Sequence, residues 1–143
     1  MAYHHVLAAY DGSKASNKAL QHAIKLVESR PGSKLTVAHV TLRPPYAFAG
    51  FGMVVPNDYE ERMKEYQNDL VRQAEDTVKE LPYAKVVVLN GTPSSALLEY
   101  ARDNCCDLIV IGNRGLGPIR EWMLGSVSHH VVQQAQIPVL VVK

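Results

Sequence analysis

The sequence predicts an α/β fold: a single doubly wound domain with a five-stranded parallel sheet and helices on both faces. In most of its short apolar segments, consecutive residues are apolar, without alternating polar residues. This pattern is typical of parallel strands that are covered on both faces. Stretches of helix length separate them, so right-handed crossovers should place helices on both sides of the sheet. The expected strands are residues 6–10, 35–40, 86–89, 108–111 and 139–142.

Length and composition indicate one domain that spans residues 1–143. The chain is 47% hydrophobic and 20% charged, as soluble globular proteins are. A formal net charge of +1 gives no electrostatic reason to expect nucleic acid or an anionic membrane as a partner. No apolar run could span a bilayer and the first residues lack a signal-peptide layout, so we expect a cytoplasmic protein. We interpret the adjacent Cys105 and Cys106 as small residues packed beside the fourth strand rather than as a redox pair.

The first two helices follow from capping residues and helical spacing. The first should begin after Ser13, a good N-cap, bury a stripe of small residues, and end before the breaker pair at 31–32. The second is expected over residues 58–81, with acidic residues in its first turn. We interpret its apolar stripe as core packing and nothing else. That stripe comprises Tyr59, Met63, Tyr66, Leu70, Ala74, Val78 and Leu81.

The last two helices have similar start signals. Thr92 and Pro93 form a cap followed by proline at the first helical position. The fourth helix is expected over residues 126–134, directly after a glycine. The buried face of the third helix should consist of Ala96, Leu97, Tyr100 and Ala101.

The stretch 111–128, between the fourth strand and the fourth helix, carries the strongest functional signal. Its glycines allow sharp turns and let a ligand approach the backbone, while serine hydroxyls and free N–H groups at a helix N-terminus suit an anion. An ordinary strand-to-helix loop is the alternative interpretation. The order Gly-x-x-Gly-x-Gly at 112–117 is not the dinucleotide fingerprint, and the chain has no P-loop motif. The residues concerned are Gly112, Arg114, Gly115, Arg120, Gly125, Ser126 and Ser128.

The spacing Gly112-x2-Gly115-x9-Gly125-Ser126 favours the functional interpretation, because it resembles the ATP-binding signature of the universal stress protein family. The resemblance extends over essentially all 143 residues, through the segments at 11–13, 39–40, 90–93 and 137–142. It implies a Rossmann-like sheet of strand order 3-2-1-4-5. Ligands in such sheets bind outside the carboxyl ends of the strands, here between strands one and four.

The resemblance also implies roles for individual residues. Asp11 would accept hydrogen bonds from ribose hydroxyls, with a plain cap or turn residue as the alternative. The backbone of Val40 would contact the adenine edge, and Arg114 is either a phosphate ligand or a solvated loop arginine. Trp122, in the long spacer, is expected to anchor it rather than stack on a base. The phosphates would lie against Gly112, Gly115, Gly125, Ser126, Val127 and Ser128.

No metal or catalytic set is evident. Adjacent histidines, at 4–5 and 129–130, point apart on a strand or helix and are joined by no further ligands at metal-binding spacing, so we expect structural or surface roles. Phosphoryl transfer needs metal ligands, charge stabilisers and a group that orients the nucleophile. The sequence offers a phosphate cradle and one carboxylate. We therefore expect no catalytic residues, and a protein that binds ATP, with or without Mg²⁺ or Mn²⁺, for regulation or stress response.

Two alternatives to a regulatory ATP-binding protein remain open. One is a slow ATPase or autophosphorylating enzyme, with Ser126 or Ser128 near the γ-phosphate. The other is a dimeric interaction protein that no longer uses nucleotide. The loop 41–56, rich in proline and glycine, is either a lid over the nucleotide or a partly ordered or partner-binding loop.

The last strand predicts a homodimer. Residues 137–143 are apolar and β-branched, and Pro138 is tolerated only at the start of a strand or on an edge. An uncovered apolar edge invites uncontrolled pairing, and antiparallel pairing with the same strand of a second copy would cover it. The family resemblance points the same way.

Overall fold

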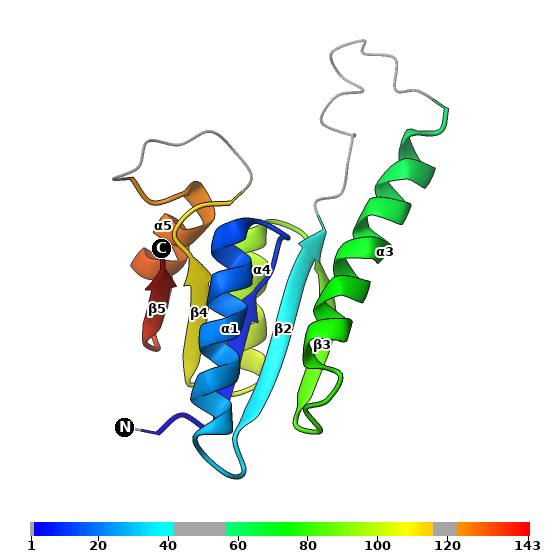
Figure 1. The fold of residues 1–143 in the computed structure, drawn as a ribbon. Helices are drawn as coiled ribbons and strands as arrows, with labels where there is room; N and C mark the ends of the chain where they lie inside the picture. Colours follow the sequence, from blue (N-terminus) through cyan, green and yellow to red (C-terminus); the bar gives the residue numbers. More distant parts are fainter. Residues whose placement is uncertain (1, 42–56, 116–122) are drawn as a thin grey trace.

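The computed structural model describes residues 2–41, 57–115 and 123–143. A parallel sheet runs through them in the order β3-β2-β1-β4-β5 (Figure 1), as predicted. The strands are β1 (His5–Ala9), β2 (Lys34–Thr41), β3 (Ala84–Asn90), β4 (Leu108–Gly112) and β5 (Val139–Val142). The helices are α1 (Lys14–Glu28), α3 (Tyr59–Val78), α4 (Pro93–Asp103) and α5 (Ser126–Gln134). Of the loop expected at 41–56, Thr41 belongs to β2, and residues 42–56 lie outside the described residues, as do the spacer residues Arg120 and Trp122.

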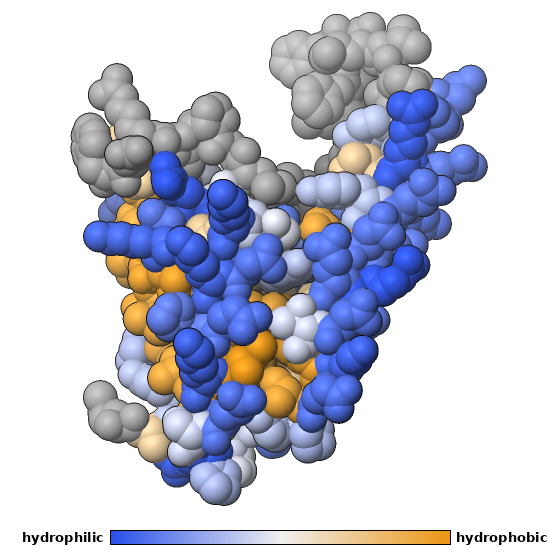
Figure 2. Space-filling model, in the orientation of Figure 1, coloured by the Kyte–Doolittle hydropathy of each residue, from blue (hydrophilic) through white to orange (hydrophobic). Residues whose placement is uncertain are grey.

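Two apolar cores sandwich the sheet. One contains buried residues of α1 and α3, and the other contains buried residues of α4 and α5. Strand β1 shows why its sequence is continuously apolar: Val6 and Ala8 belong to the first core and Leu7 to the second, and all three are 0% exposed. The outward faces of α1 and α3 are hydrophilic, with apolar side chains visible between the two helices (Figure 2).

Helix α1 begins as the sequence indicates. The Ser13 hydroxyl accepts a hydrogen bond from the N–H of Ser16 at 3.2 Å, which satisfies one of the free amides of the first turn. Gly12 precedes this cap with a φ of +82°, and a Cβ there would lie 2.5 Å from Leu70 Cδ2 on α3. Only glycine fits both conditions, so the turn after β1 packs closely against α3.

The interpretation of α3 as core packing is wrong for its first half. Leu70, Ala74 and Val78 are buried as expected, but Tyr66 is 45% exposed, and Tyr59 and Met63 are only partly buried. The reason is the length of the helix, which continues past the carboxyl ends of the strands (Figure 1). The sheet offers no surface beneath that part of the stripe.

Two smaller expectations need correction. Thr92 is the N-cap residue of α4 but makes no side-chain capping bond, so Pro93 is the effective start signal. Of the cysteines, Cys106 is buried and Cys105 is exposed, with a left-handed φ of 54°. Burial, followed by the charges of Asp107 and Cys105, raises the pKa of the Cys106 thiol to about 11.

The histidines at the start of β1 have structural roles, as predicted. His5 lies between the carbonyl oxygen of Asn104, 3.1 Å from Nδ1, and the Thr36 hydroxyl, 2.8 Å from Nε2. Asp107 accepts the backbone N–H groups of His4 and His5 at 2.8 and 2.9 Å. This carboxylate ties the beginnings of two neighbouring strands together.

Candidate functional site

A cavity of about 640 Å³ lies at the carboxyl ends of the strands. Residues at the ends of β1, β2 and β4, the beginnings of α4 and α5, and the first half of α3 surround it. This is the position where doubly wound sheets bind ligands, beside the point at which the strand order reverses.

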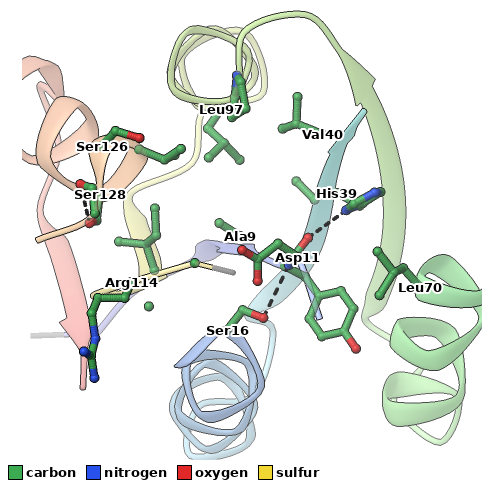
Figure 3. A pocket seen from close by; sticks show the side chains of 18 of the residues that line it. Ala9, Asp11, Ser16, His39, Val40, Leu70, Leu97, Arg114, Ser126 and Ser128 are labelled. Atoms are coloured by element: carbon green, nitrogen blue, oxygen red, sulfur yellow. Dashed lines mark hydrogen bonds between the residues drawn. The ribbon is translucent and has the colours of Figure 1, made fainter. Parts of the chain in front are cut away.

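The nine residues that were predicted to bind the nucleotide all line this cavity, although they come from four separate parts of the chain. In Figure 3, Ser126 and Ser128 lie on one side of it, Val40 and His39 lie on the other, and Asp11 lies below the space between them. That these residues contact a ligand stays a prediction. They are Asp11, Val40, Gly112, Arg114, Gly115, Gly125, Ser126, Val127 and Ser128.

Asp11 is a turn residue that also faces the cavity, and its contact with a ribose stays a prediction. Its Oδ1 accepts the N–H of Ser13 at 2.9 Å, and its own N–H donates to the Ser16 hydroxyl at 3.3 Å, so it is part of the turn before α1. Its Oδ2 lies beside Gly115, where a Cβ would be 2.8 Å away. One carboxylate oxygen therefore holds the turn and the other faces the glycine loop and the cavity. Ser16, which the sequence reasoning missed, positions this residue.

The motif glycines are explained by the space around them and not by left-handed backbone conformations. Among the described glycines, positive φ values occur at Gly12, Gly32 and Gly91, and not at the motif positions. A Cβ on Gly112 would lie 2.7 Å from Ala15 Cβ and 2.8 Å from the Ala15 carbonyl carbon. Gly112 is needed because the end of β4 touches α1, whereas Gly115 leaves room beside the Asp11 carboxylate.

The beginning of α5 has the features of an anion site. Gly125 occupies the N-cap position, where it has no side chain to cap the N–H groups of Ser126, Val127 and Ser128. The N–H of Gly125 donates to the carbonyl of Asn113 at 2.7 Å, which holds the helix start against the end of β4. Uncapped amides at the positive end of a helix dipole suit a phosphate group.

The two serines of this turn differ. Ser128 is 2% exposed, and its hydroxyl donates to the carbonyls of Asn113, at 2.9 Å, and Gly125, at 3.0 Å. Ser126 is exposed. Of the two hydroxyls, that of Ser126 is the one able to reach a ligand, and Ser128 can offer its backbone N–H.

Arg114 lines the same end of the cavity, with its guanidinium group directed away from Asp11 (Figure 3). Reaching a bound anion would require its side chain to rotate. Both interpretations of this arginine therefore stay open.

The other end of the cavity is apolar, and most of it was not predicted. Its residues come from β2, α3 and α4, and helix periodicity alone could not show that they meet. The one available signal was chemical: a stripe with two tyrosines carries hydroxyl groups that favour a position next to water. The residues that the sequence reasoning missed here include Ala38, Tyr59, Met63, Tyr66, Leu70, Pro93 and Leu97.

His39 links this apolar end to the sheet. It is 4% exposed, its Nδ1 donates to the Tyr10 carbonyl oxygen at 2.9 Å, and its Nε2 is hydrogen-bonded to the Gln67 side chain of α3. Burial raises the pKa of Tyr10 above its usual value, with smaller contributions from Asp11 and Tyr66. Its neutral hydroxyl donates to Gln73 of α3 at 3.2 Å.

Within residues 2–41, 57–115 and 123–143, no group of three or more His, Cys, Asp or Glu side chains could hold a metal ion. In the same residues, no helix has both the length and the apolar character to cross a membrane.

Comparison with known proteins gives consistent matches over the whole chain. The model of the universal stress protein family matches residues 2–143. Universal stress protein YxiE of Bacillus subtilis is 33% identical, over 99% of this chain and 99% of its own. The solved structure of MJ0577 from Methanocaldococcus jannaschii has a TM-score of 0.82 at 24% identity, covering 100% of this chain and 97% of that one.

A further solved structure is described as a universal stress protein in complex with cAMP. It is 28% identical to this chain, with a TM-score of 0.69, and the match covers 100% of this chain and 98% of that one. The family model and the Bacillus relative, taken with the fold, show that this chain belongs to the universal stress protein family.

Proposed function

We propose that this protein binds ATP in the cavity at the strand ends and acts as a nucleotide-dependent regulatory protein in the stress response. The observation that carries the proposal is the division of the cavity. An uncapped helix N-terminus and the Ser126 hydroxyl lie at one end, an apolar slot around Val40 lies at the other, and the Asp11 carboxylate lies between them. The first end suits the phosphates of ATP, the apolar slot suits its adenine base, and the carboxylate between them suits its ribose.

The size of the cavity and the relatives support the same ligand class. A volume of about 640 Å³ falls within the range of roughly 300–1,000 Å³ that is typical of small-molecule sites. The relative solved in complex with cAMP holds an adenine nucleotide. Binding rather than rapid turnover fits the site, because Asp11 already uses one oxygen in the turn before α1 and Ser128 uses its hydroxyl within the protein.

Calorimetric titration of ATP into the purified protein and two variants tests the proposal. Gly115→Val places a branched side chain against Asp11 Oδ2 and into the cavity, and should abolish binding. Ser126→Ala removes one hydroxyl bond to a charged group and should weaken binding by about 1.5 kcal/mol. Ser95→Ala, an exposed serine of α4 outside the cavity lining, is the matched control and should bind as the wild type does.

Unchanged ATP affinity in Gly115→Val would refute the assignment of the glycine loop. Identification of the compound released from freshly purified, heat-denatured protein gives an independent check. An adenine nucleotide is the expected product.

We also propose that two copies pair through β5. This strand lies at the edge of the sheet. The carbonyl of Pro138, just before it, accepts the N–H of Ile109 of β4, and the carbonyl of Val142 accepts the N–H of Asn113, just after β4. Because N–H and C=O groups alternate in direction along a parallel strand, those of Val139 and Val141 face the open edge. Exposed apolar side chains lie nearby, with Leu140 39% and Val132 44% exposed.

A further inference from the structure

The first half of α3 carries an apolar stripe, formed by Tyr59, Met63 and Tyr66, without a sheet beneath it. Tyr66 is 45% exposed, whereas Leu70, one turn further on, is 6% exposed and begins the part of the helix that packs in the core. In Figure 1 this half of α3 extends beyond the carboxyl ends of the strands. An exposed aromatic residue beside a cavity needs an explanation other than core packing.

The position of this surface relative to α4 gives the cavity two apolar walls. Helices α3 and α4 pack on opposite faces of the sheet. Met63 and Tyr66 of α3 and Leu97 of α4 all line the cavity, and Val40 at the end of β2 lies at the sheet level between the two helices. The two walls therefore bound a slot at the end of the cavity opposite the start of α5.

Two contacts fix the α3 wall in place. Gln67, next to Tyr66, is hydrogen-bonded to the buried ring of His39, which in turn donates to the Tyr10 carbonyl just before Asp11. One turn further along, Leu70 packs over Gly12, leaving no room for a Cβ. The turn after β1 therefore positions both the α3 wall and Asp11, the residue predicted to bind the ribose. A preorganised wall of this kind loses little conformational freedom when a ligand binds.

We propose that Met63 and Tyr66 form the second wall of the base pocket and make the site select a nucleotide over a bare polyphosphate. The aromatic ring and the thioether contact the flat face of the base, and Leu97 and Val40 bound the other side of the slot. Base–aromatic stacking and sulfur–aromatic contacts supply the attraction. The inference rests on the proposed function, because it concerns the same cavity, and it assigns the α3 wall to the base alone.

The test compares two ligands, ATP and inorganic tripolyphosphate, which share the phosphate chain and differ in the nucleoside. Tyr66→Ala should raise the dissociation constant for ATP by about tenfold, the loss expected for one stacked base. The same variant should bind tripolyphosphate as the wild type does, and Met63→Ala should behave in the same direction. Tyr66→Phe keeps the ring and should keep the affinity for ATP. Glu65→Ala, an exposed neighbour outside the cavity lining, is the control for changes in α3 itself.

The outcomes separate this inference from the proposed function. If the wild type binds ATP and Tyr66→Ala binds it equally well, the α3 wall does not contact the base and the inference is wrong, while the proposed function stands. If Tyr66→Ala weakens both ligands alike, Tyr66 acts on the fold or the phosphate end, which also overturns the inference. A wild type that binds neither ligand overturns the proposed function itself.

Discussion

The motif glycines show how one residue type serves two purposes in a single loop. Gly112 has no room for a Cβ because the backbone and side chain of Ala15 lie within 2.8 Å of where that atom would be. At Gly115 the nearest atom is Asp11 Oδ2, the end of a side chain that can move. Gly112 therefore serves the packing of α1 against β4, and Gly115 serves the space beside the carboxylate.

This difference predicts separate effects of adding one methyl group. Gly112→Ala should lower the free energy of unfolding by about 1–3 kcal/mol, because overpacking against the backbone forces α1 away from β4. Gly115→Ala, the matched control, should leave the stability of the ligand-free protein nearly unchanged. Urea unfolding of both variants without nucleotide measures the two effects. Equal stabilities would show that α1 yields more easily than its packing indicates.

The sequence could predict where the candidate site is, but not which of its residues face the cavity and which serve packing. The spacing of three glycines and a serine, with a carboxylate after the first strand, pointed to this cavity, and the family resemblance added Val40. The burial of the Ser128 hydroxyl depends on the position of the Asn113 carbonyl, and the need for Gly112 depends on how closely α1 approaches β4. Such distances arise only when distant segments pack together.

At the level of elements, β1 and β4 are joined at their beginnings by Asp107. Burial by itself raises the pKa of this carboxyl group, but hydrogen bonds from the backbone N–H groups of His4 and His5, with the His4 side chain, hold it below its usual value. A group whose pKa is lower in the folded state stabilises the fold above its unfolded pKa, near 3.9 for Asp. That stabilisation is lost as the pH falls through the folded value.

Asp107→Asn should therefore be less stable than the wild type at pH 7, and the difference should shrink below about pH 4 and disappear at lower pH. Denaturant unfolding at a series of pH values measures it. Asp103→Asn is the control, since it removes the same charge from an exposed side chain of α4. A stability difference that is constant with pH would mean that the carboxylate charge is not what ties the strands together.

Helix α3 shows why an element can be predicted better than its surroundings. The helical spacing of its apolar residues indicated the correct face and nearly the correct ends, 59–78 against the expected 58–81. It could not indicate how far the sheet extends beneath that face, because strand length is decided by β2 and β3. The first half of the stripe, which was predicted to be in the core, therefore lines the cavity instead.

At the scale of the whole molecule, β3 and β5 are the edge strands of the sheet, and neither pairs with a further strand within the described residues. The N–H of Val141 faces the edge of β5, as argued above. On the opposite edge, the carbonyl of Tyr83 and the N–H of Gly91 form hydrogen bonds with β2. Because backbone groups alternate in direction along a strand, the odd-numbered residues between them face β2, and the N–H of Val88 faces outward. Val88 is also 48% exposed. Val141 on β5 and Val88 on β3 are therefore matched positions, each with an N–H group that faces outward from an edge strand.

Val141→Pro should convert the proposed dimer to monomer, because it removes an outward donor without breaking a bond to β4. Val88→Pro makes the equivalent change on the other edge and should leave the dimer intact. Sedimentation velocity at micromolar concentration, with and without ATP, measures both. A wild type that remains monomeric at high concentration, or a dimer lost equally in both variants, would contradict pairing through β5.

The carbonyl of Asn113 determines how well the connection between β4 and α5 can tolerate a change in its length. It accepts hydrogen bonds from both the N–H of Gly125 and the hydroxyl of Ser128, so two bonds join the end of β4 to the start of α5. Lengthening a closed loop costs little, about 0.6 kcal/mol for each doubling. Insertions into the spacer 116–124 should therefore cost little stability and leave the start of α5 in register with the end of β4.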